Sequence, residues 1–145
     1  MDTTKQLSNM HNQEQQVYKW LVKRGSVLIF KDGDKIQLEL DQEGSASCLL
    51  TKEDTEAIIS ILTSLAEIIW HNPDYIKEPY QGQLYNTDND LVYWGLDETK
   101  LYIGFNVNED ALSISYSGDA VLKIPVNYAV ELIQILTHYS KQFGS

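Results

Sequence analysis

The chain has 145 residues, of which 43% are hydrophobic and 22% charged, and its formal net charge is −10. This length and composition are typical of one globular domain with a hydrophobic core, and no apolar run approaches the ~20 residues that cross a bilayer. The acidic excess disfavours diffuse attraction to nucleic-acid phosphates and anionic membranes, while it permits a basic protein partner.

The N-terminal half begins with a polar tail and continues as a series of short strands. Residues 1–16 have few apolar groups and no periodicity, which predicts a disordered tail without the apolar core of a signal peptide. Four short strands are predicted between residues 17 and 50, and they would form a meander. The clearest turn is Asp32-Gly33, which lies between two apolar runs and predicts a β-hairpin. Residues 36–40 alternate between apolar and polar, which predicts an antiparallel strand with one wet face.

An amphipathic helix is predicted next. Thr51 and Asp54 have the spacing of a capping box, which marks a helix start. Apolar residues then recur every three or four positions and form one stripe: Ile58, Ile61, Leu62, Leu65, Ile68 and Ile69. Pro73 predicts that the helix ends near His71, because proline disfavours helical geometry in the residue before it.

The second half of the chain repeats this order of elements. Shifted by 74 positions without a gap, residues 17–64 lie over residues 91–138 with nine identities in 48 positions. Chance would give roughly three, which favours an internal repeat. The identities include Trp20/Trp94, Leu38/Leu112 and Leu62/Leu136. We interpret residues 17–71 and 91–143 as two repeats, joined by a linker over residues 72–90.

Each repeat would offer an apolar sheet face and an apolar helix stripe, and a two-layer arrangement buries both. We therefore predict one duplicated α+β domain over residues 17–145. Its two ββββα repeats would be related by a pseudo-two-fold axis, with antiparallel sheets packed against two amphipathic helices.

The element order and the internal repeat resemble the Whirly and PUR-alpha group, whose members bind single-stranded nucleic acids and share a duplicated four-strand-plus-helix unit. Some small cyanobacterial proteins share this plan, and this chain is similar to them. The resemblance covers residues 17–143, and the passage from Leu50-Thr51 to residues 64–67 is similar to the family's strand-to-helix passage. It implies a Whirly-like fold. Whirly proteins carry a lysine- and glycine-rich strand segment for DNA binding, and nothing in this sequence matches it, so no family binding residue is carried over.

Nucleic-acid binding would require a positive groove with aromatic faces. The candidate contacts for this function are the cations near Trp20: Lys19, Lys23, Arg24, Lys31 and Lys35. The opposing interpretation is that these cations occupy ordinary solvated turns, and that Trp20 and Trp94 are matched core residues. The net charge favours this second interpretation.

The linker suggests a different kind of contact. It carries three tyrosines, Tyr75, Tyr80 and Tyr85, which are candidate contacts for a protein partner because tyrosine is enriched at interfaces. The alternative is that they cover an edge of the core.

The sequence offers no recognisable catalytic or metal-binding motif. A glycine-rich phosphate loop, a Gly-x-Ser-x-Gly elbow and a His-Glu-x-x-His motif are all missing, and the three histidines are far apart in sequence. The one cysteine, Cys48, is predicted as a buried structural thiol, and a lone cysteine favours a reducing compartment such as the cytoplasm. We expect no metal, no cofactor, no membrane association and no enzymatic activity.

We therefore predict a protein-binding or adaptor domain with an unknown protein partner, compatible with a homo-oligomer. The alternative is a single-stranded nucleic-acid-binding regulator.

Overall fold

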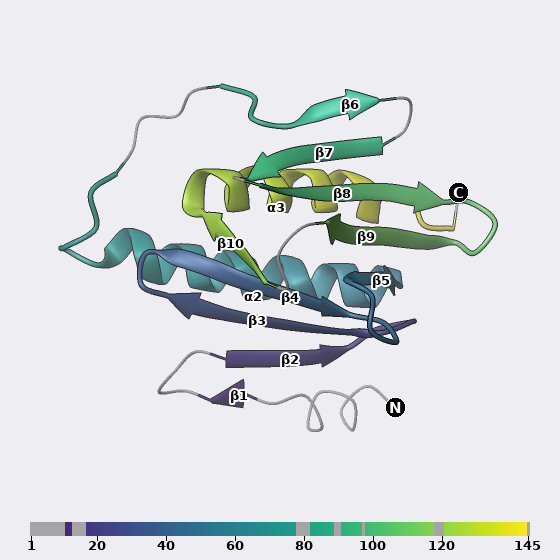
Figure 1. Ribbon diagram of the computed structural model, residues 1–145, viewed down its shortest axis with the longest axis horizontal. Coiled ribbons are helices and arrows are strands. Elements are labelled where there is room, and N and C mark those ends of the chain that lie inside the picture. The colour runs from purple at the N-terminus through teal and green to yellow at the C-terminus, as the bar shows by residue number, and fades with distance from the viewer. Residues whose placement is uncertain are drawn as a thin grey trace.

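The computed structural model describes residues 11–12, 17–77, 82–88, 91–96, 98–117 and 121–144. Within these residues the chain forms two antiparallel sheets and two helices, so the predicted α+β class is confirmed. Figure 1 shows the sheets side by side with both helices on one side of them. The buried side chains form one hydrophobic core to which both sheets and both helices contribute.

The first sheet has the strand order β1-β2-β3-β4-β10. Its strands are β1 (His11–Asn12), β2 (Val17–Leu21), β3 (Ser26–Asp32), β4 (Lys35–Asp41) and β10 (Leu122–Pro125). The predicted hairpin is confirmed, because Asp32 pairs with Lys35 across a turn in which Gly33 has a φ of +64°. That left-handed conformation suits glycine, which lacks a Cβ. The predicted disordered tail lies outside the described residues, apart from the two residues of β1, which pair with β2.

The second sheet has the strand order β5-β9-β8-β7-β6. Its strands are β5 (Ser47–Leu50), β6 (Asn86–Asp88), β7 (Leu91–Leu96), β8 (Thr99–Asn106) and β9 (Ala111–Ser117). Strand β6 falls inside the stretch that we predicted as a linker, where it pairs with β7 and forms the edge of the sheet.

Each half of the chain gives its fourth strand to the other half. Strand β5 pairs with β9, and β10 pairs with β4, so the prediction of a four-stranded meander is wrong for the fourth strand of each half. The physical reason lies in the turn before β5. Glu43 and Gly44 both have positive φ, at +53° and +84°, and the tight turn that they make leads the chain out of the first sheet. Strand β5 then lies beside β4 and β9, and Cys48, Leu49 and Leu50 are all buried there.

The strand register also departs from the ungapped alignment. The loop between β3 and β4 has two residues, whereas the loop between β8 and β9 has four. Ile29 pairs with Leu38, and the matching Ile103 pairs with Ile114. Leu38 therefore corresponds in register to Ile114, and not to the Leu112 that sequence identity suggests. A shift of two residues keeps every inward side chain inward, because side chains alternate with a period of two along a strand.

The helices are α2 (Lys52–His71) and α3 (Val126–Ser140), and they pack against each other. The predicted capping box is confirmed: the Asp54 N–H donates to Thr51 Oγ1 at 3.1 Å, and the Thr51 N–H donates to Asp54 Oδ2 at 3.0 Å. Helix α2 ends at His71 as predicted, with Asn72 as its C-cap. The predicted apolar stripe is wrong at Ile68, which is 39% exposed.

Candidate functional site

A buried carboxylate near the start of α2 organises the first half of the chain. Asp54 is fully buried, and its Oδ1 accepts a hydrogen bond from Trp20 Nε1 at 3.1 Å. Its Oδ2 accepts hydrogen bonds from the backbone N–H groups of Lys23, at 2.9 Å, and Thr51. These donors, together with the positive end of the helix dipole, compensate the cost of burying the charge. Asp54 therefore ties β2 and the turn after it to α2.

A second buried carboxylate has the same role in the other half. Glu131 on α3 is 1% exposed, and its Oε1 accepts a hydrogen bond from Trp94 Nε1 at 3.3 Å. Both of its oxygens lie 2.9 Å from the Leu84 backbone nitrogen. Each tryptophan of the matched pair thus donates to a buried carboxylate on a helix, although the two carboxylates do not align in sequence. With the contacts that they make to backbone and indole N–H groups, these acids stabilise the fold.

The candidate nucleic-acid contacts are spread along the first sheet. Lys23 and Arg24 follow β2, whereas Lys31 and Lys35 lie near the hairpin turn at the opposite end of β3. Arg24 is also engaged, because its Nη2 lies 2.6 Å from Glu109 Oε1. Lys19 is exposed in the middle of β2. Single-stranded nucleic acids require a continuous positive groove, and a role of these five cations in such a groove stays a prediction.

Two of the three candidate partner contacts of the linker, Tyr75 and Tyr85, lie within the described residues. Tyr75 and Tyr85 are half-buried and pack against the hydrophobic core. The Tyr85 ring also lies against Trp94, with ring centroids 5.8 Å apart. Tyr80 lies outside the described residues. For Tyr75 and Tyr85 the packing fits the core-covering alternative, and a role in partner contact stays a prediction.

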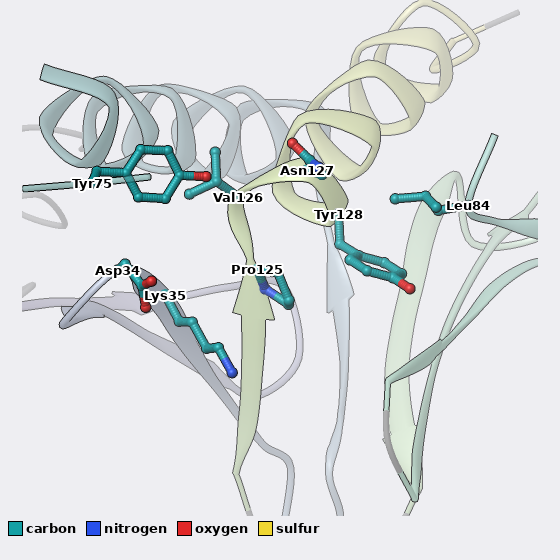
Figure 2. Close-up of a pocket in the computed structure, with 8 residues that line it drawn as sticks. All are labelled: Asp34, Lys35, Tyr75, Leu84, Pro125, Val126, Asn127 and Tyr128. Carbon is teal, nitrogen blue, oxygen red and sulfur yellow. The ribbon is translucent and has the colours of Figure 1, made fainter. Parts of the chain in front are cut away.

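Tyr75 and Tyr85 line two different hollows. The first has a volume of about 240 Å³ and lies where α3 begins (Figure 2). Figure 2 shows Tyr75 and Tyr128 on opposite sides of it, with Asp34 and Lys35 entering from the β3–β4 turn. The opposite charges of Asp34 and Lys35 offset each other at its wall, so the hollow has no single strong charge to select a ligand.

The second hollow lies between α3 and the second sheet and has a volume of about 470 Å³. Its wall is about equally polar and apolar: Val92, Phe105 and Ile135 are among the apolar residues, and Thr87, His138 and Gln142 add polar groups. The side chains of His138 and Gln142 bond to each other, with their nitrogens 3.1 Å apart. These two polar groups of the hollow are thus engaged with each other, within α3 and its C-terminal turn.

The sequence analysis missed a polar and aromatic row on the outer face of the second sheet. Strand register brings five side chains into this row, one from each strand, and we call it the tyrosine–serine face: Asn86, Tyr93, Tyr102, Ser115 and Ser47. The rings of Tyr93 and Tyr102 lie 6.0 Å apart, and Lys100 Nζ lies 5.7 Å from the Tyr93 ring centroid. Tyr93 and Tyr102 both lie in strands that the sequence predicted, at positions that alternate with the inward-facing residues. This alternation was the signal from which an outward-facing aromatic pair could have been predicted.

Cys48 is a buried thiol, as predicted. It is 1% exposed, and its Sγ lies 3.1 Å from the Ser26 carbonyl oxygen. Burial raises the pKa of Cys48 from 9.0 to about 11. Gly25 beside it has a φ of +105°, and a Cβ there would lie 3.0 Å from the Cys48 sulfur and 2.6 Å from the Asp41 oxygen. The site is therefore closed to any larger residue at position 25.

The Cys48 environment predicts how the thiol reacts and how it affects stability. We expect a thiol reagent such as Ellman's reagent to modify native protein far more slowly than unfolded protein. As pH rises above about 9, the unfolded thiol ionises while the folded thiol stays protonated until about 11. Ionisation therefore favours unfolding across that interval. In urea titrations, Cys48→Ala should show a smaller fall in stability between these pH values than wild type, and an equal fall would contradict the burial effect.

No protein-family profile matches the chain, and a search of curated proteins gives no match. Within the described ranges, no three His, Cys, Asp or Glu side chains come together in a way that could hold a metal ion. Among the helices of that part of the chain, none has the length and apolar character needed to span a membrane.

Proposed function

We propose that the chain is a non-enzymatic protein-binding module whose contact surface is the tyrosine–serine face. The observation that carries the proposal is the row of side chains across the second sheet, with Tyr93 and Tyr102 side by side on the face opposite the helices. Neither tyrosine belongs to the side chains that pack against the core. Core packing therefore does not account for these two aromatic rings.

The composition of this face supports a protein partner. Tyrosine, serine, glycine and asparagine are the residues that antibodies use for recognition, because rigid aromatic rings give contact area and small polar groups adapt their hydrogen bonds. The tyrosine–serine face contains three of these residue types, and Gly104 and Ser113 lie in the next row. The net charge of −10 favours a partner with a basic surface.

The alternative function is binding of single-stranded nucleic acid, as the resemblance to Whirly proteins implies. Two tyrosine rings with Lys100 beside them could stack bases. A single lysine gives little attraction to phosphates, and the protein as a whole is strongly acidic. Protein binding is therefore the stronger proposal. A cytoplasmic location remains part of it, supported by the one buried thiol, Cys48.

The test uses a random peptide library displayed on phage and selected against the immobilised full chain. We expect the enriched peptides to be rich in basic residues. Tyr93→Ala should weaken their binding about tenfold or more, because tyrosines that become buried at an interface are frequent hot spots. Tyr102→Ala should have a similar effect. Fluorescence anisotropy with synthetic peptides measures the affinities.

The matched control is Tyr128→Ala, which removes a half-buried tyrosine from α3, on a different surface. This variant should bind the peptides as wild type does. If the peptides bind all three variants equally, the tyrosine–serine face is not the contact surface. If labelled single-stranded DNA binds at low salt, and this binding is lost on Lys100→Glu and at higher salt, the nucleic-acid alternative would replace the proposal.

A further inference from the structure

The outer face of the first sheet carries apolar side chains that the core does not use. Side chains alternate along a strand, and the inward Val27 and Ile29 are buried. Leu28 and Phe30 therefore point outward, and Val17 lies directly opposite Phe30 on β2. None of these three is among the side chains that pack against the core. We call them the apolar face of the first sheet.

Both helices lie on the other side of the sheet, and Figure 1 shows no described element in front of this face. Adjacent apolar side chains on an otherwise wet sheet face are a common sign of an interaction surface, because burying them removes apolar area from water. A strand face that met only water would be expected to alternate cleanly between apolar and polar residues. Strand β4 does so, with Gln37 and Glu39 pointing outward.

The charges beside the apolar face indicate what covers it. Lys19, Leu28 and Glu39 form one cross-strand row, with Leu28 between the two opposite charges. A two-fold axis that runs along β3 between two facing copies exchanges the β2 side with the β4 side. Lys19 of one copy then faces Glu39 of the other, and the same pair forms twice, as an isologous interface requires. Leu28 and Phe30 would face their own counterparts.

We propose that the chain forms a two-fold symmetric homodimer in which the apolar faces of the two first sheets pack together and Lys19 pairs with Glu39 across the interface. Packed sheets lie about 10 Å apart, a gap that a lysine and a glutamate reaching from opposite sides can close. The tyrosine–serine face belongs to the other sheet, so each dimer presents two copies of it. The dimer does not depend on the proposed function of that face.

Sedimentation equilibrium of the full chain tests the dimer. Wild type should have twice the 16.6 kDa mass of the chain at high concentration and dissociate on dilution. Phe30→Glu should be a 16.6 kDa monomer with an unchanged circular dichroism spectrum. The control is Ile76→Glu, because Ile76 is 84% exposed outside both sheets, and this variant should dimerise as wild type does.

A charge exchange identifies the interface independently of the apolar change. Lys19→Glu and Glu39→Lys, each alone, should raise the dimer dissociation constant about tenfold or more, because each creates like-charge pairs. The double variant restores opposite charges and should return close to wild-type affinity. Lys52→Glu on α2 makes the same net-charge change as Lys19→Glu and should leave the affinity unaltered.

Three results would overturn the proposal. The first is a 16.6 kDa mass for wild type at every concentration. The second is a dimer that survives Phe30→Glu, which would indicate another interface. The third is a double charge variant that dimerises no better than either single variant, which would show that Lys19 and Glu39 do not face each other across the interface.

Discussion

Leu62→Ala and Leu136→Ala should each lower the free energy of unfolding by about 2–5 kcal/mol, which is the usual cost of truncating a fully buried leucine. Both side chains are fully buried, one on α2 and one on α3, and the two helices pack against each other. Each truncation removes apolar contacts and leaves a cavity in the shared core. Urea unfolding monitored by circular dichroism measures both values.

The comparison between these two variants tests the equivalence of the two halves. If the halves are equivalent, the two losses should agree within about 1 kcal/mol, less than the spread among buried leucines. Ile76→Ala is the control, and its loss should stay below about 0.5 kcal/mol because Ile76 is 84% exposed. A severe loss at one leucine and none at the other would show that the two helices are not equivalent.

Asp54→Ala should lower the free energy of unfolding by about 3–5 kcal/mol, because each buried polar group left unsatisfied costs about 1–3 kcal/mol. The change removes the acceptor for the Trp20 indole and for the backbone N–H groups of Lys23 and Thr51. Asp54→Asn keeps one acceptor oxygen and the side-chain volume, so its loss should be smaller. Urea unfolding near neutral pH measures both variants.

A double-mutant cycle isolates the indole contact. Trp20→Phe removes the indole donor, so in that background Asp54→Ala should cost about 1–3 kcal/mol less than it does alone. Hydrogen exchange gives a local measurement, because the Lys23 amide should lose protection in Asp54→Ala. A loss below about 1 kcal/mol for Asp54→Ala, with the Lys23 amide still protected, would mean that these donors find other acceptors.

Local sequence signals predicted most of the elements. The Asp32-Gly33 turn and the capping box of Thr51 and Asp54 each depend on residues close in sequence, and both were confirmed. The predicted capping box already included Asp54 and its bond with the Thr51 N–H, which is one part of the Asp54 site. Its link to Trp20 could not be predicted, because that contact spans 34 residues and an acid in a first helical turn is usually exposed.

The features that were missed depend on distant parts of the chain. Residues 46–50 would form the same short, largely apolar strand whether β5 paired with β4 or with β9, so this stretch alone does not show which sheet it joins. The two-residue register shift is hidden because it preserves alternation. Glu131 lies between apolar helix residues, and from the sequence a glutamate there is expected to be exposed to solvent. Only its contacts with the Leu84 backbone and the Trp94 indole explain its burial. The tyrosine–serine face needed the register of five strands.

The exchange of strands has a consequence for how the protein is made. Ile36 pairs with Ile124, 88 positions later, so β4 has no neighbour on one edge while the ribosome translates the residues between them. At about 5–20 residues per second, this takes roughly 4–18 s. Throughout that time the nascent chain presents an open strand edge, which can pair with another chain. The N-terminal half therefore emerges before it can complete its own sheet, and its productive folding waits for the C-terminal half.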